Sequence, residues 1–108
     1  IEIVKSLADK AIQKLKEMQY HNVIVKWGDG YQGWAEHALF DAIIVTAAPD
    51  HIPQILIDQM EIGGRLVLPV GTHFQKLKVV TKLREGKIGE KNIISVRFVP
   101  MVHSEKIP

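Results

Sequence analysis

Hydrophobic residues recur at three- and four-residue intervals near the start of the chain. Such spacing places side chains on one face of an α-helix. That face holds Val4, Leu7, Ala8, Ala11, Ile12, Leu15 and Met18. The lysines of this segment fall mostly elsewhere, which favours a solvated surface over a phosphate-binding one. The pattern therefore predicts an amphipathic helix over residues 4–20.

Three segments farther along have the composition of strands. "NVIVKW" (22–27) leads into a glycine-rich loop, and "FDAIIVTAA" (40–48) is nearly continuous and β-branched. Such a run is typical of a central strand covered on both faces. "GGRLVLPVG" (63–71) predicts another buried strand, entered through a Gly-Gly turn that can end the preceding helix. That helix is expected over residues 51–60, with Asp50 as its N-cap and Pro53 in its first turn.

The pattern changes to strict alternation after Gly71. In "QKLKVVTKLR" (75–84), Leu77, Val79, Thr81 and Leu83 alternate with a mostly basic side. "EGKIGEKN" supplies a turn and "IISVRFVP" a return strand, so we expect an antiparallel pair at the edge of a sheet. We interpret its lysines as protection of that edge against aggregation.

The alternation of helices and strands predicts an α/β fold with a parallel sheet and right-handed crossovers. Ligands of such sheets bind beyond the carboxyl ends of the strands. Glu2, the loop 28–33, the segment 46–49 and the pair 70–71 all follow strand ends. We expect them to share one rim of the sheet.

Composition limits the classes of function. The net charge is +2, from 14 basic and 12 acidic residues, which gives no argument for nucleic acid or an anionic membrane as a partner. The absence of cysteine excludes disulfides and thiolate chemistry and suits a cytoplasmic protein. The longest apolar run, residues 42–49, is far too short to span a bilayer. Histidines lack metal-ligand spacing, and no nucleophilic serine or Walker motif occurs.

Two acids and three aromatics on the rim are candidate ligand contacts. Asp29 lies between two glycines, so its carboxylate can approach a ring and accept a hydrogen bond from an exocyclic amine. Glu2 at a strand end can accept both hydroxyls of a ribose. Alone, the Gly-Asp-Gly sequence is also compatible with an ordinary turn. The aromatics Trp27, Tyr31 and Trp34 either stack on a base or peptide or pack against the sheet edge.

Four motifs taken together carry a resemblance that none carries alone. "GDGYQGW", "FDAIIVTAAPDHIPQILIDQM", "GGRLVLPVG" and "VRFVPM" occur in this order. With these spacings, residues 1 to about 102 resemble the protein-L-isoaspartate O-methyltransferases, a family of class I S-adenosylmethionine-dependent methyltransferases. The resemblance implies a partial Rossmann-like methyltransferase sheet, mostly parallel and closed by a C-terminal antiparallel hairpin.

The resemblance also implies roles for particular residues. Glu2 matches the acid that binds the cofactor ribose, and Asp29 and Gly30 match the pair that contacts adenine. Thr46 matches a cofactor-binding strand end. Substrate contacts are implied for Ala47, Ala48, Val99 and Met101. The family's first strand, its glycine-rich loop and its catalytic Ser or Thr have no counterpart. We therefore expect residues 1–108 to be the carboxyl-terminal part of a single methyltransferase domain, inactive alone.

The implied function is protein repair in the cytoplasm. A methyl group passes from S-adenosylmethionine to the α-carboxylate of an L-isoaspartyl residue in a damaged peptide or protein. The resemblance implies a monomer without nucleic-acid, membrane or metal partners. Two alternatives stay open: a methyltransferase acting on a small molecule or nucleic acid, and a non-catalytic binding module.

Overall fold

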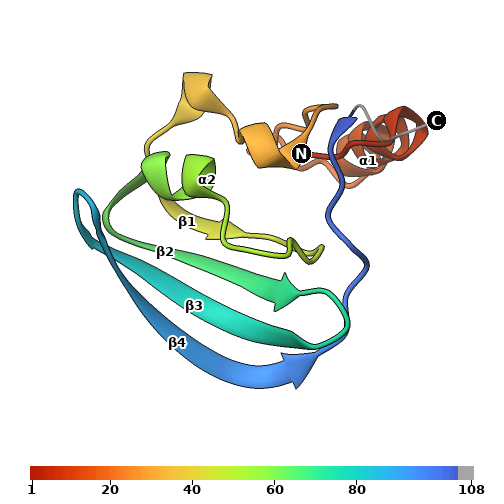
Figure 1. The fold of residues 1–108 in the computed structure, drawn as a ribbon. Coiled ribbons are helices and arrows are strands. Elements are labelled where there is room, and N and C mark those ends of the chain that lie inside the picture. The colour runs from red at the N-terminus through yellow and green to blue at the C-terminus, as the bar shows by residue number, and fades with distance from the viewer. Residues whose placement is uncertain (105–108) are drawn as a thin grey trace.

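The computed structural model describes residues 1–104, and its four strands form one sheet in the order β1-β2-β3-β4 (Figure 1). The helices and strands are α1 (Lys5–Glu17), β1 (Phe40–Ile44), α2 (Gln54–Asp58), β2 (Met60–Gly71), β3 (Gln75–Arg84) and β4 (Lys87–Val96). Two 3-10 turns, η1 (Gly30–Gln32) and η2 (Ala35–His37), lie between α1 and β1. The predicted α/β class is confirmed.

Parallel pairing in the sheet gives way to antiparallel pairing along the chain. β1 runs parallel to β2, whereas β2–β3 and β3–β4 are antiparallel. The predicted C-terminal hairpin is therefore confirmed. Its turn is shorter than predicted: β3 ends at Arg84 and β4 begins at Lys87, so most of "EGKIGEKN" lies in β4. The positive φ of Gly86, 75°, lets two residues reverse the chain.

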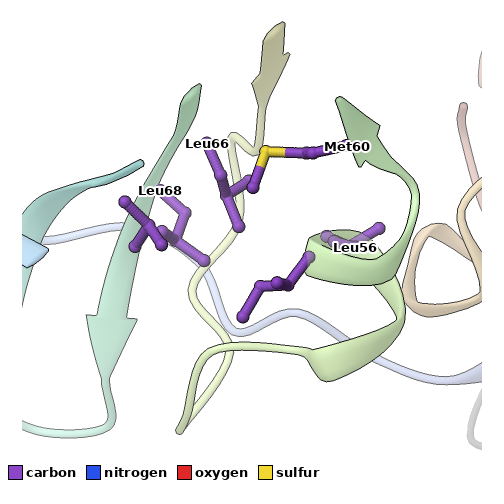
Figure 2. Close-up of a cluster of buried hydrophobic side chains, with 6 residues drawn as sticks. Leu56, Met60, Leu66 and Leu68 are labelled. Carbon is purple, nitrogen blue, oxygen red and sulfur yellow. The ribbon is translucent and has the colours of Figure 1, made fainter. Parts of the chain in front are cut away.

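The core lies between α2 and one face of the sheet. α2 lies beside the β1–β2 part of the sheet in Figure 1, and Figure 2 shows the Met60 side chain directed toward Leu66, with Leu56 on the adjacent helix. The buried cluster consists of Leu56, Ile57, Met60, Leu66, Leu68 and Val80. Large aliphatic side chains buried in this way each contribute about 1.5–3 kcal/mol to folding. This cluster fixes α2 and the central strands relative to one another.

Two strand predictions need correction. Residues 22–27 form no strand but only a single parallel bridge, between Trp27 and Glu2. The segment 40–48 is not covered on both faces, since β1 includes only Phe40–Ile44 and Ile44 is 74% exposed. Within residues 1–104, β1 is an edge strand paired only with β2, and residues 22–27 have no strand to pair with beyond the bridge at Trp27.

The caps of α2 also differ from the prediction. Asp50 is not the N-cap, because Pro53 occupies that position and the Asp50 side chain contacts His51 instead. The Gly-Gly pair does not end the helix. Gly63 and Gly64 lie inside β2, where the β1–β2 register shifts. A Cβ at Gly64 would stand 2.8 Å from the carbonyl oxygen of Glu61, so the shift requires glycine there.

The buried face of β3 is the one predicted to be polar. Val80 is fully buried and Lys82 is only 3% exposed. The Lys82 Nζ donates to the Met60 carbonyl oxygen at 3.0 Å and lies 3.4 Å from a carboxylate oxygen of Glu85. The lysines of β3 do not protect an edge, because β3 lies between β2 and β4. Two of them pair across the strands, Lys76 with Ser95 and Lys78 with Glu90.

Helix α1 is confirmed but lies apart from the sheet (Figure 1). Only Ala8 of its apolar face is buried, while Leu7, Ile12 and Met18 are about half exposed. Neither helix within residues 1–104 has the length and apolar character needed to cross a membrane.

Candidate functional site

A hollow of about 630 Å³ opens between the amino-terminal segment, β1 and the C-terminal segment. We call it the first hollow. Its volume lies within the usual range for small-molecule sites. Six of the predicted site residues line it: Glu2, Gly30, Thr46, Ala47, Val99 and Met101. Apolar side chains from β1 and α1, including Ile43 and Leu7, form much of the remaining wall.

Backbone hydrogen bonds tie Glu2 to the glycine-rich loop. The Glu2 amide donates to Lys26 at 2.9 Å, and the Gly28 amide donates to the Glu2 carbonyl oxygen at 3.0 Å. One carboxylate oxygen of Glu2 accepts from the Val4 amide at 3.0 Å. Among residues 1–104 its second oxygen, Oε2, has no hydrogen-bond partner. The predicted common rim of Glu2 and the loop is therefore present, with a carboxylate oxygen left for a ligand hydroxyl.

Asp29 occupies a different position from the one expected. Its side chain is 9% exposed, and it lines neither the first hollow nor its neighbour described below. One carboxylate oxygen accepts from the Tyr31 amide at 2.9 Å, which caps η1. The other accepts from the Ser104 amide at 3.3 Å and lies 3.5 Å from His103 Nδ1. The structure thus brings Gly30, but not the Asp29 carboxylate, to the hollow shared with Glu2.

The segment that follows β1 is joined to the C-terminal segment by backbone hydrogen bonds. Ala48 forms a parallel bridge with Pro100. Its amide donates to Val99 at 2.7 Å, and the Met101 amide donates back to Ala48 at 2.9 Å. The residues predicted to contact substrate therefore lie together. Ala48 itself is buried and belongs to the neighbouring hollow.

That neighbour, the second hollow, has a volume of about 560 Å³. Pro100, Met101 and Val102 line both hollows, so one extended segment separates them. The rest of its wall consists of Tyr31, Ala48, Asp50, His51, Gly71, Thr72, His73, Gln75 and His103. The predicted rim therefore continues across both hollows, because the Gly71 amide donates to Pro49 at 2.9 Å.

Gln59 positions the glycine-rich loop, a role that sequence analysis missed. Its Oε1 accepts from the Trp34 amide at 2.9 Å, and its Nε2 donates to Gln32 at 3.0 Å. Gly33 lies directly against this amide with a φ of +60°. A Cβ there would lie 2.0 Å from Oε1, so only glycine fits. The partners are 25 and 27 residues apart in sequence, and no local motif marks such a contact.

Two of the three aromatic residues of the loop contact other parts of the chain, and the third lines the first hollow. Trp27 donates from Nε1 to the Ile3 carbonyl oxygen at 3.1 Å, and Tyr31 stacks on His103 with ring centroids 3.9 Å apart. Trp34 lines the first hollow, with the His37 ring edge-on and the Lys26 ammonium 5.3 Å from its centroid. Of the three, Trp34 is the one available to a ligand in the first hollow.

Two pKa values near the second hollow are displaced. Burial raises the pKa of Tyr31, and the nearby carboxylates Asp50 and Asp29 raise it further. The hydrogen bond from His51 lowers the pKa of Asp50. Asp50 is therefore ionised at neutral pH, and the potential around the Tyr31 hydroxyl is negative.

The first hollow fits the adenosine part of S-adenosylmethionine. A Cβ at Gly30 would approach the Met101 methyl to 3.1 Å, so the glycine keeps this side of the hollow open. The Glu2 carboxylate suits ribose hydroxyls, and the apolar wall suits a base.

Comparison with known proteins gives a consistent result. The sequence profile of the family described as protein-L-isoaspartate(D-aspartate) O-methyltransferase matches residues 1–106. The chain is 50% identical over 107 residues to the protein-L-isoaspartate O-methyltransferase of Gloeobacter violaceus, covering 97% of this chain and 52% of that protein. It is also 50% identical over 103 residues to protein-L-isoaspartate O-methyltransferase 2 of Syntrophobacter fumaroxidans, covering 94% and 42%. The chain thus spans about half the length of the curated relatives it matches.

Solved structures show the same fold. A protein-L-isoaspartate O-methyltransferase superposes with a TM-score of 0.88 at 24% identity, covering 95% of this chain and 33% of that one. A second, from Plasmodium falciparum, was solved in complex with S-adenosyl-L-homocysteine. It superposes with a TM-score of 0.80 at 28% identity, covering 94% and 50%.

Proposed function

The chain belongs to the protein-L-isoaspartate(D-aspartate) O-methyltransferase family, and on that premise we propose that the full-length protein methylates L-isoaspartyl residues with S-adenosylmethionine. The acceptor is the α-carboxylate of an isoaspartyl residue in a damaged protein. The ester then allows return to normal aspartate by way of a succinimide. We assign this protein-repair activity to a cytoplasmic monomer with a Rossmann-like sheet and without nucleic-acid or membrane partners.

The residues of the first hollow have separate tasks in this proposal. Glu2 accepts the ribose hydroxyls of the cofactor, while Gly30 admits the adenine close to the backbone. Asp29, whose two carboxylate oxygens accept from backbone amides in this structure, would accept from the adenine amine. Thr46, which lines the first hollow, would contact the cofactor. The cofactor supplies the sulfonium methyl group, and these residues hold it in place.

The acceptor needs little chemical activation. A carboxylate with an ordinary pKa of about 4 is already ionised at neutral pH. The chain contributes alignment of two bound reactants, and such positioning can supply roughly 7–11 kcal/mol. Ala47 and Ala48 leave room for the peptide, and Val99 and Met101 confine it from the other side. We expect the catalytic Ser or Thr of the family outside these residues.

One observation carries the proposal most directly. The hydrogen bonds that join Ala48 to Val99 and Met101, beside a hollow lined by Glu2 and Gly30, support it. The residues that we propose for the cofactor and for the substrate are then neighbours, as group transfer requires. The two alternatives lack a comparable observation. Within residues 1–104 neither hollow has a Lys or Arg in its lining, and the matching family is described by its isoaspartyl substrate, not by a small molecule, a nucleic acid or a binding role.

The test is methyl transfer by the full-length protein to a matched peptide pair. One peptide contains L-isoaspartate and the other L-aspartate at the same position. We expect base-labile incorporation of radiolabelled methyl groups into the isoaspartyl peptide only. Equal labelling of both peptides, or of neither, would contradict the proposal, and transfer to a nucleic acid or small acid instead would support the first alternative.

A further inference from the structure

The second hollow has no assigned occupant, although only one extended segment separates it from the first. Pro100, Met101 and Val102 form the shared wall. A substrate peptide that lies along this wall, with its isoaspartyl carboxylate directed to the first hollow beside the cofactor, has the side chain of an adjacent residue within reach of the second hollow. This geometry makes the second hollow a subsite for a residue adjacent to the reacting one.

The charges around the second hollow select the class of side chain. Its ionisable lining residues are Tyr31, Asp50, His51, His73 and His103. No Lys or Arg belongs to this lining within residues 1–104. The hydrogen bond from His51 lowers the pKa of the Asp50 carboxyl. Within residues 1–104, Asp50 is the one carboxylate of this lining, so it is the charged group that a ligand in the hollow would meet.

The lining of the hollow offers both an aromatic surface and an acid. Tyr31 and His103, which stack with an interplanar angle of 14°, both belong to the lining. Lys and Arg bury an aliphatic stem on apolar surface and keep the charged end in water. Asp50, whose side chain is 66% exposed, is the acid that such a charged end would reach.

Resting on the proposed function, we propose that the second hollow binds a lysine or arginine side chain adjacent to the isoaspartyl residue, with Asp50 as the specificity-determining acid. The ion pair forms at a solvated site, where such pairs are weak, so we expect a preference of at most about fivefold in KM. The preference concerns binding, so kcat stays the same.

The experiment uses the full-length protein and six isoaspartyl peptides. They carry lysine, norleucine or glutamate at the residue before or after the isoaspartate. Norleucine matches the lysine stem without its charge. At one of the two positions, we expect KM to rise from lysine to norleucine to glutamate while kcat is unchanged.

Two matched variants locate the effect. Asp50→Asn removes the carboxylate and is expected to abolish the difference between lysine and norleucine. Asp9→Asn removes a similarly exposed acid on α1, which pairs with Lys5 outside both hollows, and is expected to keep it. A loss of preference in both variants would overturn the inference in favour of long-range charge effects.

The outcomes separate the inference from the proposed function. Equal KM for lysine, norleucine and glutamate at both positions, with the peptides methylated, overturns the subsite and leaves the function intact. If none of the six isoaspartyl peptides is methylated, the proposed function fails and the inference fails with it. Retention of the lysine preference in Asp50→Asn would exclude Asp50 as the selecting acid.

Discussion

Strands β2 and β3 and helix α1 in the amino-terminal region each carry an apolar face in the sequence, but the two regions differ in burial. In the sheet, Leu66, Leu68 and Val80 are completely buried, and α2 covers them. In the amino-terminal region, the apolar face of α1 is about half exposed and borders the first hollow. Periodicity therefore predicts which residues share a face, whereas burial depends on an element that covers the face.

The largest expected effect is the loss of stability when a buried side chain of β2 is truncated, compared with a half-exposed one on α1. Leu66→Ala in the chain of residues 1–108 should lower the free energy of unfolding by about 2–5 kcal/mol, because it leaves a cavity among packed side chains. Leu7→Ala should change it by less than about 1 kcal/mol, since Leu7 is 48% exposed. Urea unfolding followed by circular dichroism measures both. Equal losses would show that the two regions are buried alike.

A smaller effect tests how the loop is attached to the sheet. Gln59→Ala removes the acceptor of the Trp34 amide and the donor to Gln32. We expect a loss of about 1–3 kcal/mol and faster hydrogen exchange at the Trp34 amide. Gln13→Ala is the matched control, because Gln13 bonds only Glu17 within the exposed surface of α1. Unchanged hydrogen exchange at the Trp34 amide in Gln59→Ala would contradict the role of Gln59 in positioning the loop.

The smallest effect concerns alkaline pH. The pKa of Tyr31 is raised by burial and by Asp50 and Asp29, so the folded chain favours the neutral phenol. The resulting stabilisation is complete below the unfolded pKa, about 10, and is lost as pH rises through the folded pKa. Tyr31→Phe should therefore reduce the fall in urea midpoint between pH 8 and 11. Tyr20→Phe, at a half-exposed tyrosine, should retain the wild-type fall.

Sequence analysis predicted the elements of the fold better than their environment. The helical period over residues 4–20 and the alternation in β3 identified both elements correctly. The face of β3 was assigned wrongly, because Lys82 is buried with its ammonium bonded to Met60, a partner 22 residues away. The prediction that residues 40–48 are covered on both faces was also wrong, because such coverage depends on neighbouring elements that the local sequence does not contain.

For the site as well, local sequence predicted the positions along the chain but not the contacts between distant segments. Strand ends predicted that Glu2, Gly30 and Thr46 lie on one rim, because parallel strands end at the same edge. Local sequence carried no signal for Gln59, nor for the engagement of Asp29 by His103. Both arise from contacts between distant segments. The roles in binding stay predictions.

The most direct test of the account is calorimetry of S-adenosylhomocysteine binding to the full-length protein. Glu2→Gln removes the charge proposed to accept the ribose hydroxyls, and hydrogen bonds to charged groups contribute about 1.5–3 kcal/mol. Glu17→Gln, on the exposed end of α1, is the control. We predict at least about tenfold weaker binding for Glu2→Gln and wild-type binding for Glu17→Gln. Wild-type affinity in Glu2→Gln would contradict the assignment of the first hollow to the nucleoside.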